Sequence, residues 1–369
     1  MPPPSLPLLL LSVVVPEHAP HFVIAFALVA LTACFALRGR MRFVAAGASA
    51  LALVLALAPL AALPGTIDAS DAAVSEATGR DVAPGETADR VPFDLMRELA
   101  GSPALAPLPV QRDRPVIAGD GARLGLDLYR AATPGPRPTV ILMYGGAWQY
   151  GKRSNMEPLA RTLAALGYTA IVVDYRHAPA YRFPTQRDDV RAALVTIAKN
   201  ARRWAVDPER VATLGESAGA ELALLAAYEP GPLHIRAAIA FYPPLDLAGA
   251  YETPPHPDPA NVRSLLTTYL GGPPEGPPAS ERAAYAAASP RTHVGPGLPP
   301  TLLIGGVRDQ LCAVTFQREM RSALAAAGDR VASLEFPWSN HGFAALSNGL
   351  GGQLARYYTE RFLAETMGR

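Results

Sequence analysis

Short apolar runs alternate with longer amphipathic segments from about residue 110 onward. Residues 139–144 and 168–175 are almost wholly apolar, as is typical of strands buried in a parallel sheet. Residues 188–204 between such runs have helical spacing. Strands are also expected at 211–214, 237–242, 301–306 and 331–336, and in a hairpin that turns at Gly119-Asp120-Gly121. This alternation predicts an α/β fold with a mostly parallel central sheet covered by helices on both faces.

The composition of the remaining segments suggests how the chain is divided. Residues 64–109 are rich in Ala, Pro, Gly and acidic residues, so we expect a linker with one short helix near 93–99. Residues 110–369 then form the α/β domain, interrupted by a Pro-rich insertion at about 243–300. A long insertion of this kind is either a lid over a site or an ordinary surface excursion.

Two longer apolar runs precede this domain. Residues 22–37 and 43–63 contain no charged residue, and as helices they reach roughly 24 and 31 Å against a hydrocarbon core of about 30 Å. The earlier apolar run, residues 6–15, is too short to span and is expected to lie at an interface. The pattern predicts that residues 1–63 are a membrane segment with two transmembrane helices.

The charges around these runs predict their orientation. Arg38, Arg40 and Arg42 lie between the two spans, and short loops rich in arginine stay in the cytoplasm. Acidic residues follow the second span, so we expect the domain outside the cytoplasm. Two alternatives remain: a cleaved signal peptide, which would normally have a basic residue before its apolar run, and a topology in which residues 6–15 also span.

Charge and cysteine content exclude some function classes. The formal net charge is +1, which provides no basic field for nucleic acid. Cys34 and Cys312 are the two cysteines, and they are far apart in the sequence. They predict neither a disulfide framework nor a metal site.

A serine lies between two glycines at a strand-to-helix corner in residues 211–228. A serine at such a turn has a strained backbone that raises its hydroxyl above the sheet, and small residues at Gly215 and Gly219 avoid a collision. The helix that begins at Ala218 directs its free N–H groups and positive dipole end toward this hydroxyl. Ser217 is therefore the candidate nucleophile.

A serine nucleophile needs a base, and the base needs an orienting carboxylate. In this architecture the chain order is Ser, then Asp or Glu, then His. His341 follows the last predicted strand, and Asp309 follows the strand before it, with Asp246 as the competing acid. Glu216 is expected to point away from the site. The other histidines lie in the membrane segment, before the serine or in loops: His18, His21, His177, His234, His256 and His293.

The loop "MYGGAWQYG" follows the first buried parallel strand. Gly145 and Gly146 permit a close backbone approach, although a simple turn would also use them. The N–H of Gly146, with that of Gly145 or Ala147 and that of Ala218, could stabilise the oxyanion of a tetrahedral intermediate. Trp148 is expected to pack under this loop.

With these motifs, the chain resembles α/β-hydrolase esterases of the hormone-sensitive-lipase-like and acetyl-esterase-like branch. The matching motifs are "YGGAW", "DYR" with a later "FP" and Asp, "DP.R" before "G.SAG", "PPTLL..G..D" and "HGF". They cover about residues 110–369. The chain departs from the family at Tyr144, where the family usually has histidine, and at Ala147, where it has a third glycine.

The resemblance implies a serine carboxylester hydrolase that favours short acyl chains and needs no metal or organic cofactor. In that function Ser217 attacks the acyl carbon, His341 transfers the proton and Asp309 holds the imidazolium. The expected partners are a small-molecule ester and the membrane, with no nucleic acid. Alternatives are an amidase, formamidase or peptidase of the same fold, an inactive binding module, and a membrane protein whose hairpin is the functional part.

Overall fold

The computed structural model describes residues 5–36, 38–80, 91–102, 107–274 and 279–368. In these residues eight strands form one sheet, in the order β1-β2-β4-β3-β5-β6-β7-β8. β2 is antiparallel to both its neighbours, and all other neighbouring pairs are parallel, as predicted. The strands are β1 (Val110–Ile117), β2 (Arg123–Tyr129), β3 (Arg137–Met143), β4 (Thr169–Val173), β5 (Val206–Glu216), β6 (Ile235–Phe241), β7 (Thr301–Gly306) and β8 (Val331–Phe336).

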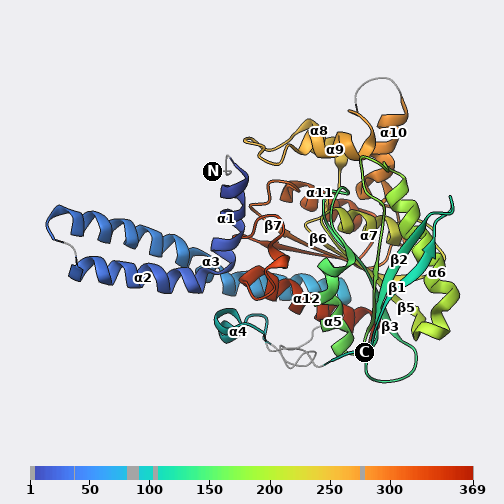
Figure 1. The fold of residues 1–369 in the computed structure, drawn as a ribbon, viewed down its shortest axis with the longest axis horizontal. Helices are drawn as coiled ribbons and strands as arrows, with labels where there is room; N and C mark the ends of the chain where they lie inside the picture. Colours follow the sequence, from blue (N-terminus) through green and yellow to red (C-terminus); the bar gives the residue numbers. More distant parts are fainter. Residues whose placement is uncertain (1–4, 37, 81–90, 103–106, 275–278, 369) are drawn as a thin grey trace.

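Helices cover both faces of this sheet, which confirms the α/β-hydrolase fold predicted from the sequence (Figure 1). One face carries α6, α7 and α11, and the other carries α5, α12 and the end of α3, as right-handed crossovers require. The helices are α1 (Leu6–Glu17), α2 (Ala19–Ala36), α3 (Arg40–Thr78), α4 (Leu95–Ala100), α5 (Glu157–Ala165), α6 (Thr185–Trp204), α7 (Ala218–Tyr228), α8 (Leu247–Glu252), α9 (Val262–Leu270), α10 (Ala279–Ala288), α11 (Val314–Ala326) and α12 (Leu350–Met367).

The central strands are buried on both faces, which explains why their sequences are continuously apolar. Every residue of β4 and β7 is buried. The parallel register pairs Glu216 with Phe241 and Phe241 with Ile304, so β5, β6 and β7 end at nearly the same level. The loops after these strands therefore meet at one edge of the sheet, the edge where open α/β sheets bind their ligands.

The two apolar helices α2 and α3 form a hairpin that projects from the domain (Figure 1). By length and composition, both are able to cross a membrane. Large apolar side chains on the hairpin face outward, among them Phe35, Phe43 and Leu51. A contiguous exposed apolar surface of this kind marks an interaction site or a membrane-facing region.

The predicted linker at residues 64–109 differs from the structure in its first part. α3 does not end after the apolar run but continues to Thr78, although it contains Pro59 and Pro64. Proline disfavours a helix interior because it removes one hydrogen bond and crowds the preceding turn. Here burial of Val74 and Ala77 against the domain supports the helix. The rest of the predicted linker contains α4, and its residues 81–90 and 103–106 lie outside the described part.

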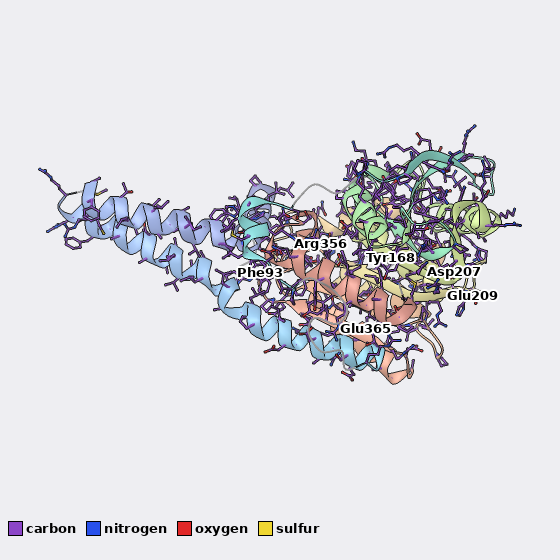
Figure 2. All side chains as sticks on the ribbon, turned by 90° about the horizontal axis from the view of Figure 1, so that it is seen from below. Phe93, Tyr168, Asp207, Glu209, Arg356 and Glu365 are labelled. Atoms are coloured by element: carbon purple, nitrogen blue, oxygen red, sulfur yellow. The ribbon has the colours of Figure 1, made fainter. Side chains whose placement is uncertain are left out.

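The second half of α3 lies along α12 (Figure 2), and polar contacts join the two helices. The Arg361 guanidinium on α12 donates to Asp71 Oδ1 at 2.7 Å and to Ser75 Oγ at 2.8 Å. Arg361 also pairs with Glu365, whose other carboxylate oxygen accepts a hydrogen bond from Thr78 at 2.7 Å. The acidic residues that suggested a linker in the sequence therefore belong to a packed helix pair.

The short helix α1 lies against the domain at the base of the hairpin. It contacts α12, α3 and the 3-10 turn Phe343–Ala345. Its last residue, Glu17, is fully buried, while Leu6, Leu10 and Leu11 remain exposed. α1 thus has one side in the domain and one apolar side uncovered, in line with the interfacial position expected for residues 6–15.

Candidate active site

The serine turn between β5 and α7 has the strained geometry expected from its sequence. Ser217 has φ 51° and ψ −123°, a backbone region that non-glycine residues rarely adopt. A Cβ added at Gly215 would overlap the Gly219 carbonyl, and one added at Gly219 would overlap the carbonyls of Met143 and Tyr144. The two glycines are therefore required by close backbone approach, as predicted.

Ser217, His341 and Asp309 lie in one hydrogen-bonded line at the carboxyl edge of the sheet. The distance from Ser217 Oγ to His341 Nε2 is 2.8 Å, and the distance from His341 Nδ1 to Asp309 Oδ2 is also 2.8 Å. An imidazole protonated at Nδ1 donates to the carboxylate and presents Nε2 as an acceptor for the serine hydroxyl. This arrangement orients a base toward a hydroxyl, which is what nucleophilic catalysis by serine needs.

The Asp309 carboxylate is fixed by the turn that follows β7. Its second oxygen, Oδ1, accepts hydrogen bonds from the N–H groups of Leu311 and Cys312, both at 2.8 Å. Oδ2 is thereby left to His341. Because the side chain is buried, the carboxylate is held in one orientation.

The competing acid, Asp246, has a different structural role. Its Oδ1 caps α8 by accepting from the Gly249 N–H at 2.9 Å, and its Oδ2 pairs with Arg291 at 3.0 Å. Both carboxylate oxygens are therefore engaged with groups other than His341. The geometry selects Asp309 over Asp246.

The glycine loop after β3 lies directly against the serine turn. A Cβ placed on Gly145 would be 3.1 Å from Ser217 Cβ and 2.8 Å from the Glu216 carbonyl oxygen. Gly146 has φ +139°, and Ala147 follows it with φ 49°. On the other side of the serine, Ala218 is the first residue of α7, so its N–H has no partner within the helix. Of the four predicted donor residues, Gly145 lies against Ser217 and Ala218 directly follows it, while Gly146 lies against the Tyr150 carbonyl.

Tyr144, where the sequence departs from the resembling family, is buried beneath the glycine loop. Its hydroxyl donates to Asp174 Oδ1 at 2.5 Å and lies 3.1 Å from His177 Nε2. Its ring stacks on Tyr175, whose hydroxyl donates to the Tyr144 carbonyl at 2.8 Å. Burial raises the pKa of the Tyr144 phenol, which stays neutral. Tyr144 therefore supports the loop from below.

Trp148 packs under the loop as expected, and it has a partner that the sequence analysis missed. The indole stacks on Tyr269 of the Pro-rich insertion, with ring centroids 4.0 Å apart. Its Nε1–H donates to Glu221 on α7 at 3.0 Å. Burial raises the pKa of Glu221 to about 8. A glutamate in an otherwise Ala/Leu-rich helix was the only sequence signal for this contact.

Tyr269 also defines how the Pro-rich insertion meets the site. Besides stacking on Trp148, it contacts Phe183, and its backbone carbonyl accepts from the Phe183 N–H at 3.0 Å. The insertion, with α8, α9 and α10, is therefore anchored at α9 to the loop beside Ser217 (Figure 1).

The partly buried Glu216 and the buried Tyr242 form a pair next to the imidazole. The rings of Tyr242 and His341 lie 4.8 Å apart in an edge-to-face arrangement. Burial raises the pKa of Glu216 to about 7, while a hydrogen bond with Tyr242 and the nearby His341 oppose the shift. Glu216 also borders a cavity of about 570 Å³ between α5 and α12, which it shares with Leu159, Phe241 and other residues. This cavity reaches the serine turn at Glu216.

The loop that carries His341 is held by α1, a contact that the sequence did not predict. Asn340 Oδ1 accepts from the His341 N–H at 2.7 Å, and Asn340 Nδ2 donates to Ser12 Oγ at 2.8 Å. Ser339 Oγ donates to the buried Glu17 carboxylate, which also accepts from the Gly351 N–H at 2.6 Å. The N-terminal helix therefore helps to fix the backbone on which the imidazole sits.

Known proteins similar to this chain are esterases. A family model described as BD-FAE matches residues 126–324. The probable carboxylic ester hydrolase LipM of Mycobacterium tuberculosis is 30% identical over 256 residues, which cover 65% of this chain and 58% of that protein. The chain spans about three fifths of the length of LipM and of two further mycobacterial esterases, LipQ and LipC.

Solved structures give the same result. A bacterial heroin esterase matches with a TM-score of 0.62 and 27% identity, covering 70% of this chain and 84% of that one. EstE1, a thermophilic carboxylesterase cloned from a metagenomic library, matches with a TM-score of 0.61, covering 85% of this chain and 99% of that one. At 22% identity the likeness to EstE1 shows the fold alone. Together the comparisons confirm the resemblance to α/β-hydrolase esterases.

Proposed function

Because the chain belongs to the BD-FAE family and has an α/β-hydrolase fold, we propose that it hydrolyses carboxylic esters with Ser217 as nucleophile. The observation that carries the proposal is the line from Ser217 Oγ through His341 to Asp309, with two hydrogen bonds of 2.8 Å. The esterase names of the relatives support the reaction class.

In the first half of the reaction, Ser217 Oγ attacks the acyl carbon while His341 Nε2 takes the hydroxyl proton. The resulting imidazolium is held by Asp309. The oxyanion is stabilised by the Ala218 N–H together with N–H groups of Gly145, Gly146 or Ala147. Collapse of the intermediate breaks the ester C–O bond, and the leaving alcohol takes the proton from His341. An acyl-enzyme remains on Ser217.

In the second half, water replaces the serine hydroxyl as nucleophile. His341 Nε2 takes a proton from this water as it attacks the acyl carbon, and a second oxyanion forms next to the same N–H groups. The Ser217–acyl bond then breaks, and Ser217 Oγ recovers its proton from His341. The products are a carboxylic acid and an alcohol, and the enzyme returns to its starting state.

The reaction is tested with the full chain in detergent and p-nitrophenyl acetate as substrate. Ser217→Ala should lower kcat by about 10⁶-fold, because the nucleophile is lost while the fold remains. Ser322→Ala, which changes an exposed serine on α11, is the matched control and should keep wild-type activity. A fluorophosphonate probe should label the wild type but not Ser217→Ala. Unchanged turnover in Ser217→Ala would remove Ser217 from this role.

We also propose that short acyl chains are preferred. The support for this preference is the likeness to the acetyl-esterase-like branch drawn from the sequence motifs. In a series of p-nitrophenyl esters from acetate to palmitate, kcat/KM should be highest for acyl chains of about two to four carbons. A maximum at long chains would contradict the preference while leaving ester hydrolysis itself intact. The corresponding anilides measure how far the same site accepts amides.

The hairpin is proposed to anchor the domain at the outer side of a membrane. The exposed apolar faces of α2 and of the first half of α3 support anchoring, and Arg38, Arg40 and Arg42 near the hairpin's tip support a cytoplasmic tip. An alkaline phosphatase fused after Arg369 should be active in cells, and a cytoplasmic reporter at the same place inactive. The opposite result would reverse the orientation.

A further inference from the structure

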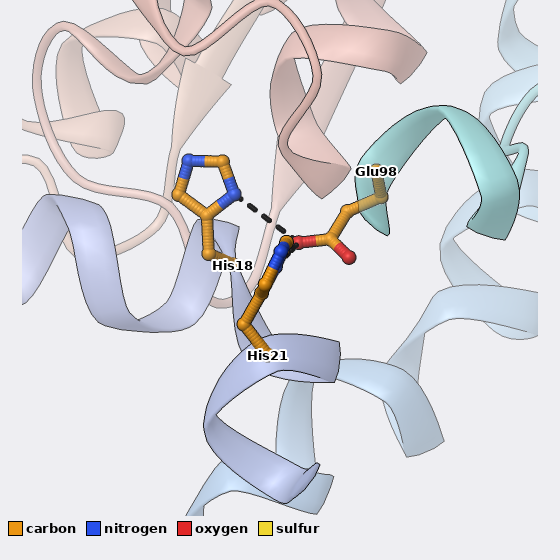
Figure 3. Close-up of side chains that lie close together, drawn as sticks. All are labelled: His18, His21 and Glu98. Atoms are coloured by element: carbon orange, nitrogen blue, oxygen red, sulfur yellow. Dashed lines mark hydrogen bonds and ion pairs between the residues drawn. The ribbon is translucent and has the colours of Figure 1, made fainter. Parts of the chain in front are cut away.

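Three potential metal ligands meet at the base of the hairpin (Figure 3), and all three are far from Ser217 in the sequence. His18 lies between α1 and α2, and His21 is three residues further on in α2. His18 caps the C-terminal end of α1 and His21 lies in the first turn of α2, and both imidazoles approach the same carboxylate. Glu98 of α4 comes from a segment 77 residues downstream of His21 and lies between the two rings.

The geometry of these groups fits a small cation. His18 Nδ1 lies 3.1 Å and His21 Nδ1 lies 2.6 Å from the same oxygen, Glu98 Oε1. The ligand atoms of the three residues all lie within 4.8 Å of one another. Ligands bound tetrahedrally to Zn²⁺ at about 2.0–2.2 Å are roughly 3.4 Å apart. A shift of the Glu98 carboxylate by less than about 1 Å would therefore open room for the ion.

The burial of Glu98 separates this cluster from an ordinary surface hydrogen bond. Glu98 is only 3% exposed. Both histidines approach Oε1, whereas Oε2 has no hydrogen-bond partner among the described residues. A buried carboxylate oxygen without a partner is costly, so a purely hydrogen-bonded cluster leaves this site incomplete. A cation that both carboxylate oxygens approach would give Oε2 the partner it lacks among the described residues.

We propose that His18, His21 and Glu98 bind one Zn²⁺ ion, which fastens the start of the hairpin to the hydrolase domain. Two imidazoles and one carboxylate are a ligand set that Zn²⁺ accepts, with a water in the fourth position. His18 and His21 remain 25% and 47% exposed, so the ion and the water can enter from solvent. The role is structural, and it is independent of the proposed esterase reaction.

The cysteine count and sequence spacing could not indicate this site. His18 and His21 lie next to the apolar run of α2, and the third ligand, Glu98, lies within the predicted linker after α3. The residues meet because α2 folds back along α3 and α4 packs against the base of α2. The ion would therefore link the start of α2 to α4, two segments that are far apart in the sequence.

The first experiment measures the metal itself. The full chain is purified in detergent with a tag that contains no histidine, stripped with EDTA, equilibrated with micromolar Zn²⁺ and passed through a desalting column. Elemental analysis should find about one Zn²⁺ per chain. Glu98→Gln and His21→Ala should each weaken binding by more than about a hundredfold. His234→Ala removes an exposed histidine outside the cluster and should retain the ion.

A second measurement tests the structural role without any activity assay. Hydrogen exchange of the α4 amides should slow about a hundredfold when free Zn²⁺ is a hundred times its dissociation constant, since opening then requires loss of the ion. EDTA should reverse this protection, and Mg²⁺ should not reproduce it, because Mg²⁺ prefers oxygen ligands in an octahedral site. Glu98→Gln, which keeps the shape of the side chain, should show no response to Zn²⁺.

Two results would overturn the proposal. One is a full chain that retains no Zn²⁺ under these conditions. The other is equal retention by the wild type, Glu98→Gln and His21→Ala, which would place the ion elsewhere. Since ester hydrolysis is read separately with Ser217→Ala, either result would leave the proposed function standing.

Discussion

At the carboxyl edge of the sheet, Ser217, His341 and Asp309 are held by hydrogen bonds of 2.8 Å, whereas in the hairpin Phe35 and Phe43 are 84% and 69% exposed. The sheet edge satisfies its polar groups with contacts from its own loops and, at Ser339 and Asn340, from α1. The hairpin leaves a large apolar surface that the described residues do not cover. One chain thus combines a site whose polar side chains are paired with a hairpin whose apolar side chains are exposed.

The second half of α3 and the helix α1 connect these two regions. Arg361 joins α3 to α12 through Asp71, and Glu17 joins α1 to the loop before His341 through Ser339. These contacts are polar and buried, unlike those of the hairpin. Substitutions at the sheet edge, at this junction and in the hairpin are therefore expected to differ in their effects on kcat and on the free energy of unfolding.

The largest effect is expected at the sheet edge. Asp309→Asn should lower kcat for p-nitrophenyl acetate by about 10⁴-fold with little change in thermal stability, because the amide favours the wrong imidazole tautomer. Asp246→Asn is the matched control, since its carboxylate caps α8 instead. A larger loss of kcat in Asp246→Asn than in Asp309→Asn would reverse the choice of acid.

At the junction, Arg361→Ala should lower the free energy of unfolding by about 3–5 kcal/mol, because it leaves the buried Glu365 carboxylate without its cation. Arg318→Ala breaks an exposed pair with Glu335 and should cost less than about 1 kcal/mol. Chemical unfolding in detergent measures both. Arg361→Met combined with Glu365→Leu should recover much of the loss, and failure to do so would argue against an unpaired charge as the cause.

Glu17 should make the junction sensitive to pH. Burial raises the pKa of Glu17 to about 7, so between about pH 4.5 and 7 the folded chain holds a proton that the unfolded chain releases. The stability contributed by Glu17 is therefore greatest at low pH, falls as the pH rises through this window and then levels off.

Glu17→Gln cannot titrate and should remove this dependence. The stability of Glu17→Gln relative to wild type should rise by about 2 kcal/mol between pH 5 and 8. The difference isolates Glu17, since Glu216 and Glu221 titrate in both proteins. Thermal unfolding across this range provides the measurement. A constant difference between the two proteins would show that Glu17 titrates at its ordinary pKa.

The smallest effect is expected in the hairpin. Leu28→Ala trims an exposed side chain of α2 and should change stability in detergent by less than about 0.5 kcal/mol. Val74→Ala, in the buried half of α3, should cost about 1–3 kcal/mol because it leaves a cavity. Equal costs for the two substitutions would mean that the hairpin is packed against protein on both sides.

Much of the fold and of the candidate site could be predicted because the signals are local. The strands Thr301–Gly306 and Val331–Phe336 have the predicted bounds, since a run of apolar residues between turns suits a buried parallel strand. The glycines around Ser217 report a steric requirement of the turn itself. Chain order together with its place after the last predicted strand favoured His341 as the base, and the strand ends left two aspartates as candidate acids.

What could not be predicted depends on partners far away in the sequence. Pro64 and the acidic residues after it read as a linker because the sequence does not show Arg361 facing Asp71. Glu17 and Ser12 seemed part of a membrane segment, and their contacts with Ser339 and Asn340 span more than 300 residues. Contacts between residues so far apart leave no periodic pattern in the sequence that could predict them.

By itself, the sequence determined the order of strands and helices, the strained serine corner and the apolar character of the hairpin, because each follows from the steric and hydrophobic properties of neighbouring residues. Only the tertiary structure decided that α3 extends into the domain, that Asp309 and not Asp246 faces His341, and that His18, His21 and Glu98 meet. These outcomes depend on how buried polar groups find their partners, and that is settled only when the elements pack.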